Sequence, residues 1–191
     1  MLTLYFAPGT SSMAPHIALN EIGVPFEARA MGPGATREPA YRALNPEGKV
    51  PTLSVDGRPM TEVAAILFYL ARRFPEAGLL PDEVEAQAQA ISWMSFLAST
   101  VHPARRQGLE HARGIYALAD ARLGARAWAV GSSYSIADIH LFRLFWRFSG
   151  SLNPARTEFP NLFAHYDRIL DRPAVRKTIQ IESEIGYRLP A

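Results

Sequence analysis

The chain has 191 residues, of which 48% are hydrophobic and 20% charged, so its composition is that of one ordinary globular domain or two small ones. Its longest apolar run, residues 64–71, is far shorter than the roughly 18 residues of a membrane-spanning helix, and residues 1–5 lack the basic flank of a signal peptide. Membrane insertion and secretion are therefore not expected. The formal net charge of +2 is spread along the chain, which disfavours nucleic-acid binding.

The sequence contains no cysteine. This excludes disulfides, cysteine-ligated zinc, iron–sulfur clusters and a protein thiol nucleophile. The five histidines do not show the paired spacing of a metal site, so no metal is expected. If thiol chemistry takes place here, a ligand must supply the sulfur.

The first part of the chain alternates strand and helix patterns. In chain order the pattern predicts a strand over residues 2–6, a helix starting near Ser11 or Ser12 and ending at Gly23, a strand over 24–28, a short helix over 38–44, a strand over 50–55, a hairpin turn at 56–57 into 58–60, and a helix after Thr61 that reaches Phe74. Such an order predicts an α/β layer architecture with a mixed sheet.

The second part of the chain is predicted to be entirely helical. Amphipathic stretches cover residues 84–101, 109–123, 136–148 and 161–170. The Ser-Ile-Ala-Asp run at 135–138 has the form of a capping box at the start of the third stretch. We therefore predict an α/β domain over residues 1–74, a linker over 75–81 and an all-helical domain over 82–191.

Five segments in order resemble the cytosolic glutathione transferase superfamily, and the first is similar to the opening of its bacterial beta-type members. They are residues 5–19, the N-P-E-G-K-V-P-T-L run at 45–53, the T-E-V-A-A-I run at 61–66, residues 93–98 with His102, and the S-I-A-D run at 135–138 with the prolines that punctuate residues 160–175. The resemblance spans almost the whole chain. It implies a thioredoxin-like N-terminal domain, an all-helical C-terminal domain, and a cytoplasmic homodimer with its active site near the domain cleft.

The resemblance also implies an enzyme of detoxification that activates the thiol of glutathione for attack on apolar electrophiles. The alternatives are a non-catalytic binding or interaction protein on the same scaffold, since fold does not fix function, and another glutathione-dependent enzyme such as a lyase, isomerase or dehalogenase. The sequence does not identify the electrophile.

Glutathione has an amine and two carboxylates, and the resemblance assigns residues to each part of it. A cis peptide bond before Pro51 would expose the Val50 backbone to the cysteinyl part, whereas a trans proline at a strand start is the alternative. Backbone N–H groups at Glu62 and Val63 would hold the γ-glutamyl carboxylate, with the Glu62 carboxylate near the ammonium. An acidic residue such as Glu62 is also favoured near a helix N-terminus, and the two interpretations can hold together. Lys49 would reach the glycyl carboxylate, or it is an exposed loop lysine.

Ser11 is the candidate for thiol activation, at a position where the beta-type proteins carry cysteine. A serine hydroxyl can donate a hydrogen bond to the thiolate, although Ser11 or Ser12 can instead be a helix cap. Tyr5 is the fallback donor, or a packing residue of its strand. His102 would line the substrate site, or compensate a helix dipole.

The sequence departs from the family at two points. Val63 stands where a serine or a similar small residue is usual, which removes a hydroxyl from the predicted carboxylate site. The stretch between His102 and Gly131 is also shorter than in the beta-type proteins, which predicts a shallower or more open substrate pocket.

Overall fold

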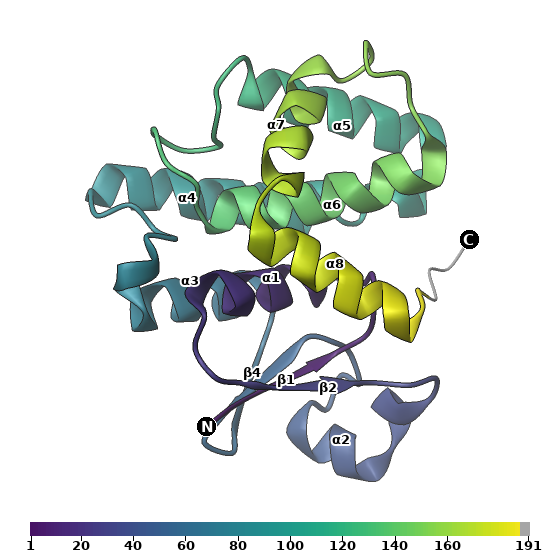
Figure 1. Cartoon of the computed structure of the whole chain (residues 1–191). Helices are drawn as coiled ribbons and strands as arrows, with labels where there is room; N and C mark the ends of the chain where they lie inside the picture. The colour runs from purple at the N-terminus through teal and green to yellow at the C-terminus, as the bar shows by residue number, and fades with distance from the viewer. Residues whose placement is uncertain (188–191) are drawn as a thin grey trace. The chain divides into compact units, whose positions relative to one another are not determined.

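The computed structural model describes residues 1–187, and its contacts group the chain into two compact units (Figure 1). The first unit comprises Met1–Ala77 together with the segment from Pro173 onward, and the second comprises Gly78–Arg172. The prediction from sequence divides the chain into the consecutive segments 1–74, 75–81 and 82–191. The contacts instead group the segment from Pro173 onward with the N-terminal residues. Within residues 1–187, no helix is long and apolar enough to cross a membrane.

The first unit is built on a four-stranded mixed sheet with the strand order β2-β1-β3-β4. Its elements are β1 (Leu2–Phe6), α1 (Met13–Ile22), β2 (Glu27–Ala30), η1 (Ala35–Arg37), α2 (Pro39–Leu44), β3 (Thr52–Val55), β4 (Arg58–Thr61), α3 (Val63–Arg73), η2 (Pro75–Ala77) and α8 (Pro173–Ile185). Strand β1 pairs with β2 in parallel and with β3 in antiparallel orientation. This β-α-β plus β-β-α order confirms the predicted α/β architecture with a mixed sheet, and it is the thioredoxin-like fold that the family resemblance implies.

The side chains of β1 point alternately to the two faces of the sheet, and each set packs against helices on its own face. Leu4 and Phe6 are fully buried or nearly so, and Phe6 packs against His16 of α1. Thr3 and Tyr5 point to the opposite face, where Tyr5 packs against Tyr41 of α2. Figure 1 accordingly shows α1 and α3 on one face of the sheet and α2 on the other.

Two strands begin later than their sequence patterns predict. The ladder between β1 and β2 starts with Thr3 opposite Glu27, so residues 24–26 form the approach to the strand. Strand β3 begins at Thr52 because Pro51 has no N–H to donate to a ladder. The predicted hairpin is present, since β3 and β4 pair from Thr52 opposite Thr61 to Val55 opposite Arg58.

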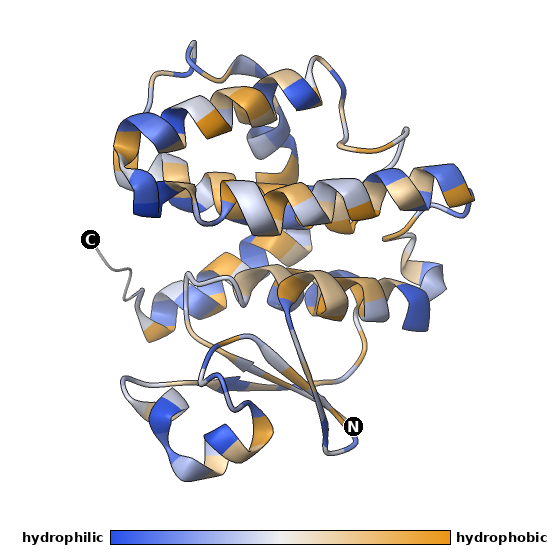
Figure 2. Ribbon diagram, turned by 180° about the vertical axis from the view of Figure 1, so that it is seen from behind, coloured by the Kyte–Doolittle hydropathy of each residue, from blue (hydrophilic) through white to orange (hydrophobic). Residues whose placement is uncertain are grey.

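All the regular elements of the second unit are helices, joined by irregular segments such as residues 124–135. Its elements are α4 (Val84–Phe96), the π-helical turn η3 (Leu97–Val101), η4 (Ala104–Gln107), α5 (Leu109–Leu123), α6 (Ile136–Leu152) and α7 (Pro160–Leu170). Hydrophobic and hydrophilic residues alternate along most of these ribbons (Figure 2), as expected of helices that bury one face. Ser135 and Asp138 form the predicted capping box at the start of α6, with the Ser135 N–H donating to the carboxylate at 2.9 Å.

Candidate active site

The loop from Ala7 to Ser12 joins β1 to α1, and the two serines in it have different roles. Ser12 is fully buried and occupies the N-cap position of α1, but its hydroxyl makes no cap bond. That hydroxyl instead accepts the Ala7 N–H at 3.0 Å and lies 2.7 Å from the Thr10 hydroxyl. Ser12 therefore holds the loop closed on itself.

Ser11 faces another part of the chain. Its hydroxyl donates to the carbonyl oxygen of Val50 at 3.1 Å, across 39 positions of sequence. The peptide bond between Val50 and Pro51 is cis, as the resemblance predicts. The structure thus brings together the candidate for thiol activation and the backbone segment predicted to receive the cysteinyl part of glutathione.

Two buried polar side chains donate to the Lys49 carbonyl just before this segment, and a third buried side chain links the two. The Tyr41 hydroxyl donates to the Lys49 carbonyl at 2.6 Å, and the Asn45 side-chain amide donates to the same oxygen at 2.8 Å. The Thr52 hydroxyl lies 2.8 Å from the Tyr41 oxygen and 3.1 Å from the Asn45 nitrogen. No role is predicted for these residues from the sequence. Asn45 and Thr52 lie in the segment that resembles the family, but no sequence motif shows that a polar side chain will be buried or which partner it will find.

The other predicted glutathione-binding residues lie in the same unit. Glu62 immediately precedes α3 with a φ of 67°, and its carbonyl accepts the Ile66 N–H at 3.0 Å. Val63 is the first residue of that helix and its side chain is buried. Lys49 is exposed and its ammonium pairs with Glu47 at 2.6 Å.

Tyr5 is engaged on the α2 face of the sheet. Its hydroxyl accepts a hydrogen bond from the guanidinium of Arg29 at 3.2 Å, and the Arg29 carbon lies 5.6 Å from the centre of its ring. The ring of Tyr41 lies on the same face at 5.6 Å. These contacts fit the packing interpretation of Tyr5.

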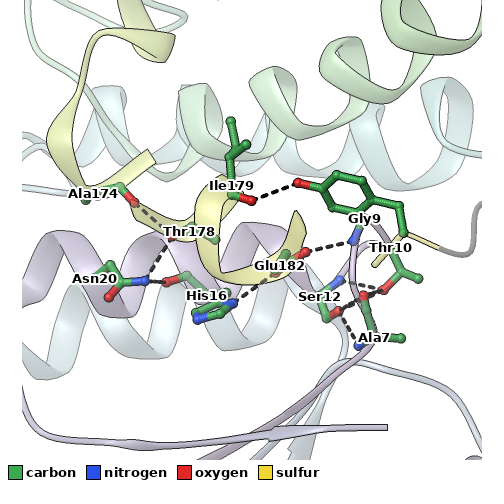
Figure 3. Close-up of polar contacts among 11 residues, drawn as sticks. Ala7, Gly9, Thr10, Ser12, His16, Asn20, Ala174, Thr178, Ile179 and Glu182 are labelled. Carbon is green, nitrogen blue, oxygen red and sulfur yellow. Dashed lines mark hydrogen bonds and ion pairs between the residues drawn. The ribbon is translucent and has the colours of Figure 1, made fainter. Parts of the chain in front are cut away.

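A buried carboxylate from α8 is bonded to the loop before α1 and to His16 (Figure 3). Glu182 is fully buried; it accepts the Gly9 N–H at 2.7 Å and pairs with Nδ1 of His16 at 2.9 Å. Beside it, Asn20 of α1 donates to Thr178 of α8 at 2.9 Å. Because these partners lie more than 150 positions apart, no local pattern could have predicted them.

His102 belongs to the second unit and follows the π-helical turn η3. His102 is exposed to solvent, and partial desolvation, followed by the charges of Arg143, Arg106 and Arg147, lowers its pKa. His140 of α6 is fully buried, and desolvation lowers its pKa to about 3.

The chain has a thioredoxin-like unit, in which a serine lies beside a cis proline, and a second unit made of helices. This combination places the chain in a known class of proteins. Residues 4–78 match the family model of the glutathione S-transferase N-terminal domain, and residues 79–173 match that of the C-terminal domain. The chain belongs to the glutathione S-transferase family of enzymes.

Relatives and solved structures agree with this assignment. Glutathione S-transferase GST-4.5 of Xanthomonas campestris is 30% identical, over 95% of this chain and 98% of its own. A sphingomonad glutathione S-transferase complexed with glutathione is 33% identical with a TM-score of 0.85, covering 95% of this chain and 98% of its own. The bacterial beta class enzyme of Sphingomonas chungbukensis is 34% identical with a TM-score of 0.84, covering 94% and 98%.

Not every relative carries the name of a transferase. Maleylacetoacetate isomerase of Pseudomonas aeruginosa is 29% identical, over 69% of this chain and 74% of its own. The family is thus fixed, whereas the particular reaction is not.

Proposed function

We propose that this protein is a glutathione transferase in which the Ser11 hydroxyl stabilises the glutathione thiolate. The observation that carries the proposal is the hydrogen bond from Ser11 to the Val50 carbonyl at 3.1 Å, beside the cis peptide bond. It sets the hydroxyl next to the backbone group that would pair with the cysteinyl part of the ligand. A thiol bound in this position has a hydrogen-bond donor within reach.

The same hydrogen bond suggests how Ser11 becomes available to the sulfur. In the protein alone, its one proton is engaged by the Val50 carbonyl. The cysteinyl N–H of glutathione would replace it on that carbonyl, which leaves the hydroxyl free to rotate toward the thiolate. The Val50 carbonyl then still has a donor, so the exchange leaves no acceptor unpaired.

The chemical step requires no covalent bond to the protein. The thiol loses its proton to solvent, Ser11 donates a hydrogen bond to the resulting thiolate, and the sulfur attacks an electrophilic carbon of the second substrate. A carbon–sulfur bond forms while the leaving group departs with its electron pair. Stabilising the thiolate and orienting it are the contributions of the protein.

We assign the two ends of glutathione to residues on either side of this centre. The N-terminus of α3 at Glu62 and Val63 would receive the γ-glutamyl carboxylate, because the first N–H groups of a helix lack intrahelical partners. Lys49 would exchange Glu47 for the glycyl carboxylate, since that ion pair is exposed and therefore weak. His102 is proposed to line the site of the apolar electrophile.

Isothermal titration with glutathione tests the proposal, followed by assays with chloro-nitroarenes. Binding with turnover supports a transferase. Binding without turnover favours an isomerase, in line with the relative from Pseudomonas aeruginosa, or a carrier. No heat at millimolar glutathione would contradict the proposal and favour the non-catalytic interaction protein.

We further propose a cytoplasmic homodimer with a role in detoxification. Phe68 on α3 is a large apolar side chain that is 37% exposed. A second copy of this chain would cover it. Sedimentation as a 21.1 kDa monomer at micromolar concentration would contradict the dimer.

A further inference from the structure

We propose that Tyr41, Asn45 and Thr52 form a positioning cluster that fixes the Val50 backbone for glutathione. The inference rests on the proposed function, because it concerns the same binding segment. The three side chains act through the Lys49 carbonyl and are not expected to touch the substrate themselves.

The segment between α2 and β3 needs such support because it lies outside helix and strand. Residues 45–51 contribute no strand ladder, so their direction depends on other contacts. Gly48 shows how closely this path is confined: its φ is 63°, and a Cβ at this position would lie 2.8 Å from the carbonyl oxygen of Thr36. Only glycine fits there without a shift of the backbone.

The hydrogen bonds of the cluster can be oriented by counting protons. Tyr41 has one hydroxyl proton, and it goes to the Lys49 carbonyl at 2.6 Å. The 2.8 Å contact between Thr52 and Tyr41 must therefore be donated by Thr52. Asn45 supplies both of its amide protons, one to the Lys49 carbonyl and one to the Thr52 hydroxyl oxygen.

In this arrangement, every hydroxyl and side-chain amide proton of the three residues is donated in a hydrogen bond, and the Lys49 carbonyl accepts two of these bonds. The Asn45 side-chain oxygen is also used, since it accepts the Glu47 N–H at 3.1 Å. Burial raises the pKa of the Tyr41 phenol, so the hydroxyl remains a donor at neutral pH. All three side chains are at least 96% buried, with 4%, 3% and 0% exposed for Tyr41, Asn45 and Thr52, so water cannot easily replace a missing partner.

The consequence concerns the next residue along the chain. Because the Lys49 carbonyl belongs to the peptide unit that also carries the Val50 N–H, fixing the carbonyl fixes the direction of that N–H. The Val50 carbonyl is in turn held by Ser11. The cluster therefore sets in advance the backbone that pairs with the cysteinyl part of glutathione, which lowers the ordering cost of binding.

The test compares two tyrosines and two substitutions of Thr52. Tyr41→Phe and Thr52→Val each remove a hydroxyl at nearly constant volume, and each should raise the Kd for glutathione about five- to tenfold. Thr52→Ser keeps the hydroxyl and should bind as the unaltered protein does. Since Ser11 is intact, the pKa of the bound thiol should stay the same in all three variants.

Tyr116→Phe is the matched control. Tyr116 is also 4% exposed and its hydroxyl also donates to a backbone carbonyl, that of Leu144 at 3.0 Å, but it lies in the helical unit. It should lose stability as Tyr41→Phe does and leave the Kd unchanged. A Kd equal in Tyr41→Phe and Tyr116→Phe would overturn the positioning role.

Amide hydrogen exchange separates this inference from the proposed function. In the protein without ligand, Tyr41→Phe should speed exchange at Gly48 and Val50 more than Tyr116→Phe does. If the unaltered protein binds no glutathione, the proposed function fails and the cluster has no role in binding it. Unchanged exchange at Gly48 and Val50 would overturn the ordering of the segment whether or not glutathione binds.

Discussion

Ser11→Ala removes the donor that we assign to the thiolate and little else. The side chain is half-buried, and its hydroxyl makes one hydrogen bond, to the Val50 carbonyl at 3.1 Å. The loop itself is held by Ser12 and by Glu182, which the substitution does not alter. The fold should therefore survive, and the change should appear in the chemistry of bound glutathione.

The size of the effect follows from the kind of hydrogen bond that is lost. A hydrogen bond to a charged group contributes about 1.5–3 kcal/mol, which corresponds to roughly one to two pK units. Because Ser11 is only half-buried, water screens the sulfur in part, and the lower end applies. The pKa of the bound thiol should rise by about one unit in Ser11→Ala. At a pH below the pKa of the bound thiol, kcat/KM of this variant should therefore be about tenfold lower than that of the unaltered protein.

Thiolate absorbance of the complex against pH measures this shift directly. Ser183→Ala is the matched control, because its hydroxyl also donates to a backbone carbonyl, that of Gln180 at 2.8 Å, but on an exposed part of α8. Tyr5→Phe should not move the curve, since the Tyr5 ring packs against Tyr41 on the α2 face of the sheet. An unchanged curve in Ser11→Ala with a shifted curve in Tyr5→Phe would refute the reasoning and transfer the role to Tyr5.

Three further predictions concern anchoring, stability and acid. Val63→Ser adds a hydroxyl where we place the γ-glutamyl carboxylate and should tighten glutathione binding about tenfold by titration, with the thiol pKa unchanged. Glu182→Gln breaks the buried pair with His16 and should lower the free energy of unfolding in urea by about 1.5–3 kcal/mol. His140, whose pKa is lowered to about 3, binds a proton in the unfolded chain before it does in the folded one. Stability should therefore fall as the pH drops from about 6.5 toward 3, by up to about 1.4 kcal/mol per pH unit, and His140→Phe should reduce that fall.

Each of the three has a clear contrary outcome. Equal gains in Val63→Ser for glutathione and for an analogue without the γ-glutamyl carboxylate would show that the carboxylate is not held there. Glu184→Gln, on the exposed side of α8, should leave the free energy of unfolding nearly unchanged. If it lowers that free energy as much as Glu182→Gln does, the buried pair of Glu182 and His16 does not contribute specifically to stability. An identical acid transition in His140→Phe would show that another group controls it.

The order of helices and strands was determined largely by local sequence. Helix α1 ends at Gly23, which has the left-handed conformation that glycine adopts without strain, and the hairpin turn is at residues 56–57 as predicted. The capping box at Ser135 depends on a spacing of three residues. Such signals lie within one or two turns of chain, so they can be read without knowing the fold. The family resemblance extended this reading to the cis bond before Pro51.

The contacts that give the site its shape were decided only by tertiary structure. Ser11 meets Val50 across 39 positions, and Glu182 meets Gly9 across 173. Buried polar groups need hydrogen-bond partners in any fold, but which partner a group finds depends on how helices and strands pack. The same packing decides that the hydroxyl of Ser12 closes the loop while that of Ser11 faces the cis-proline segment, a difference between adjacent serines that the sequence alone does not contain.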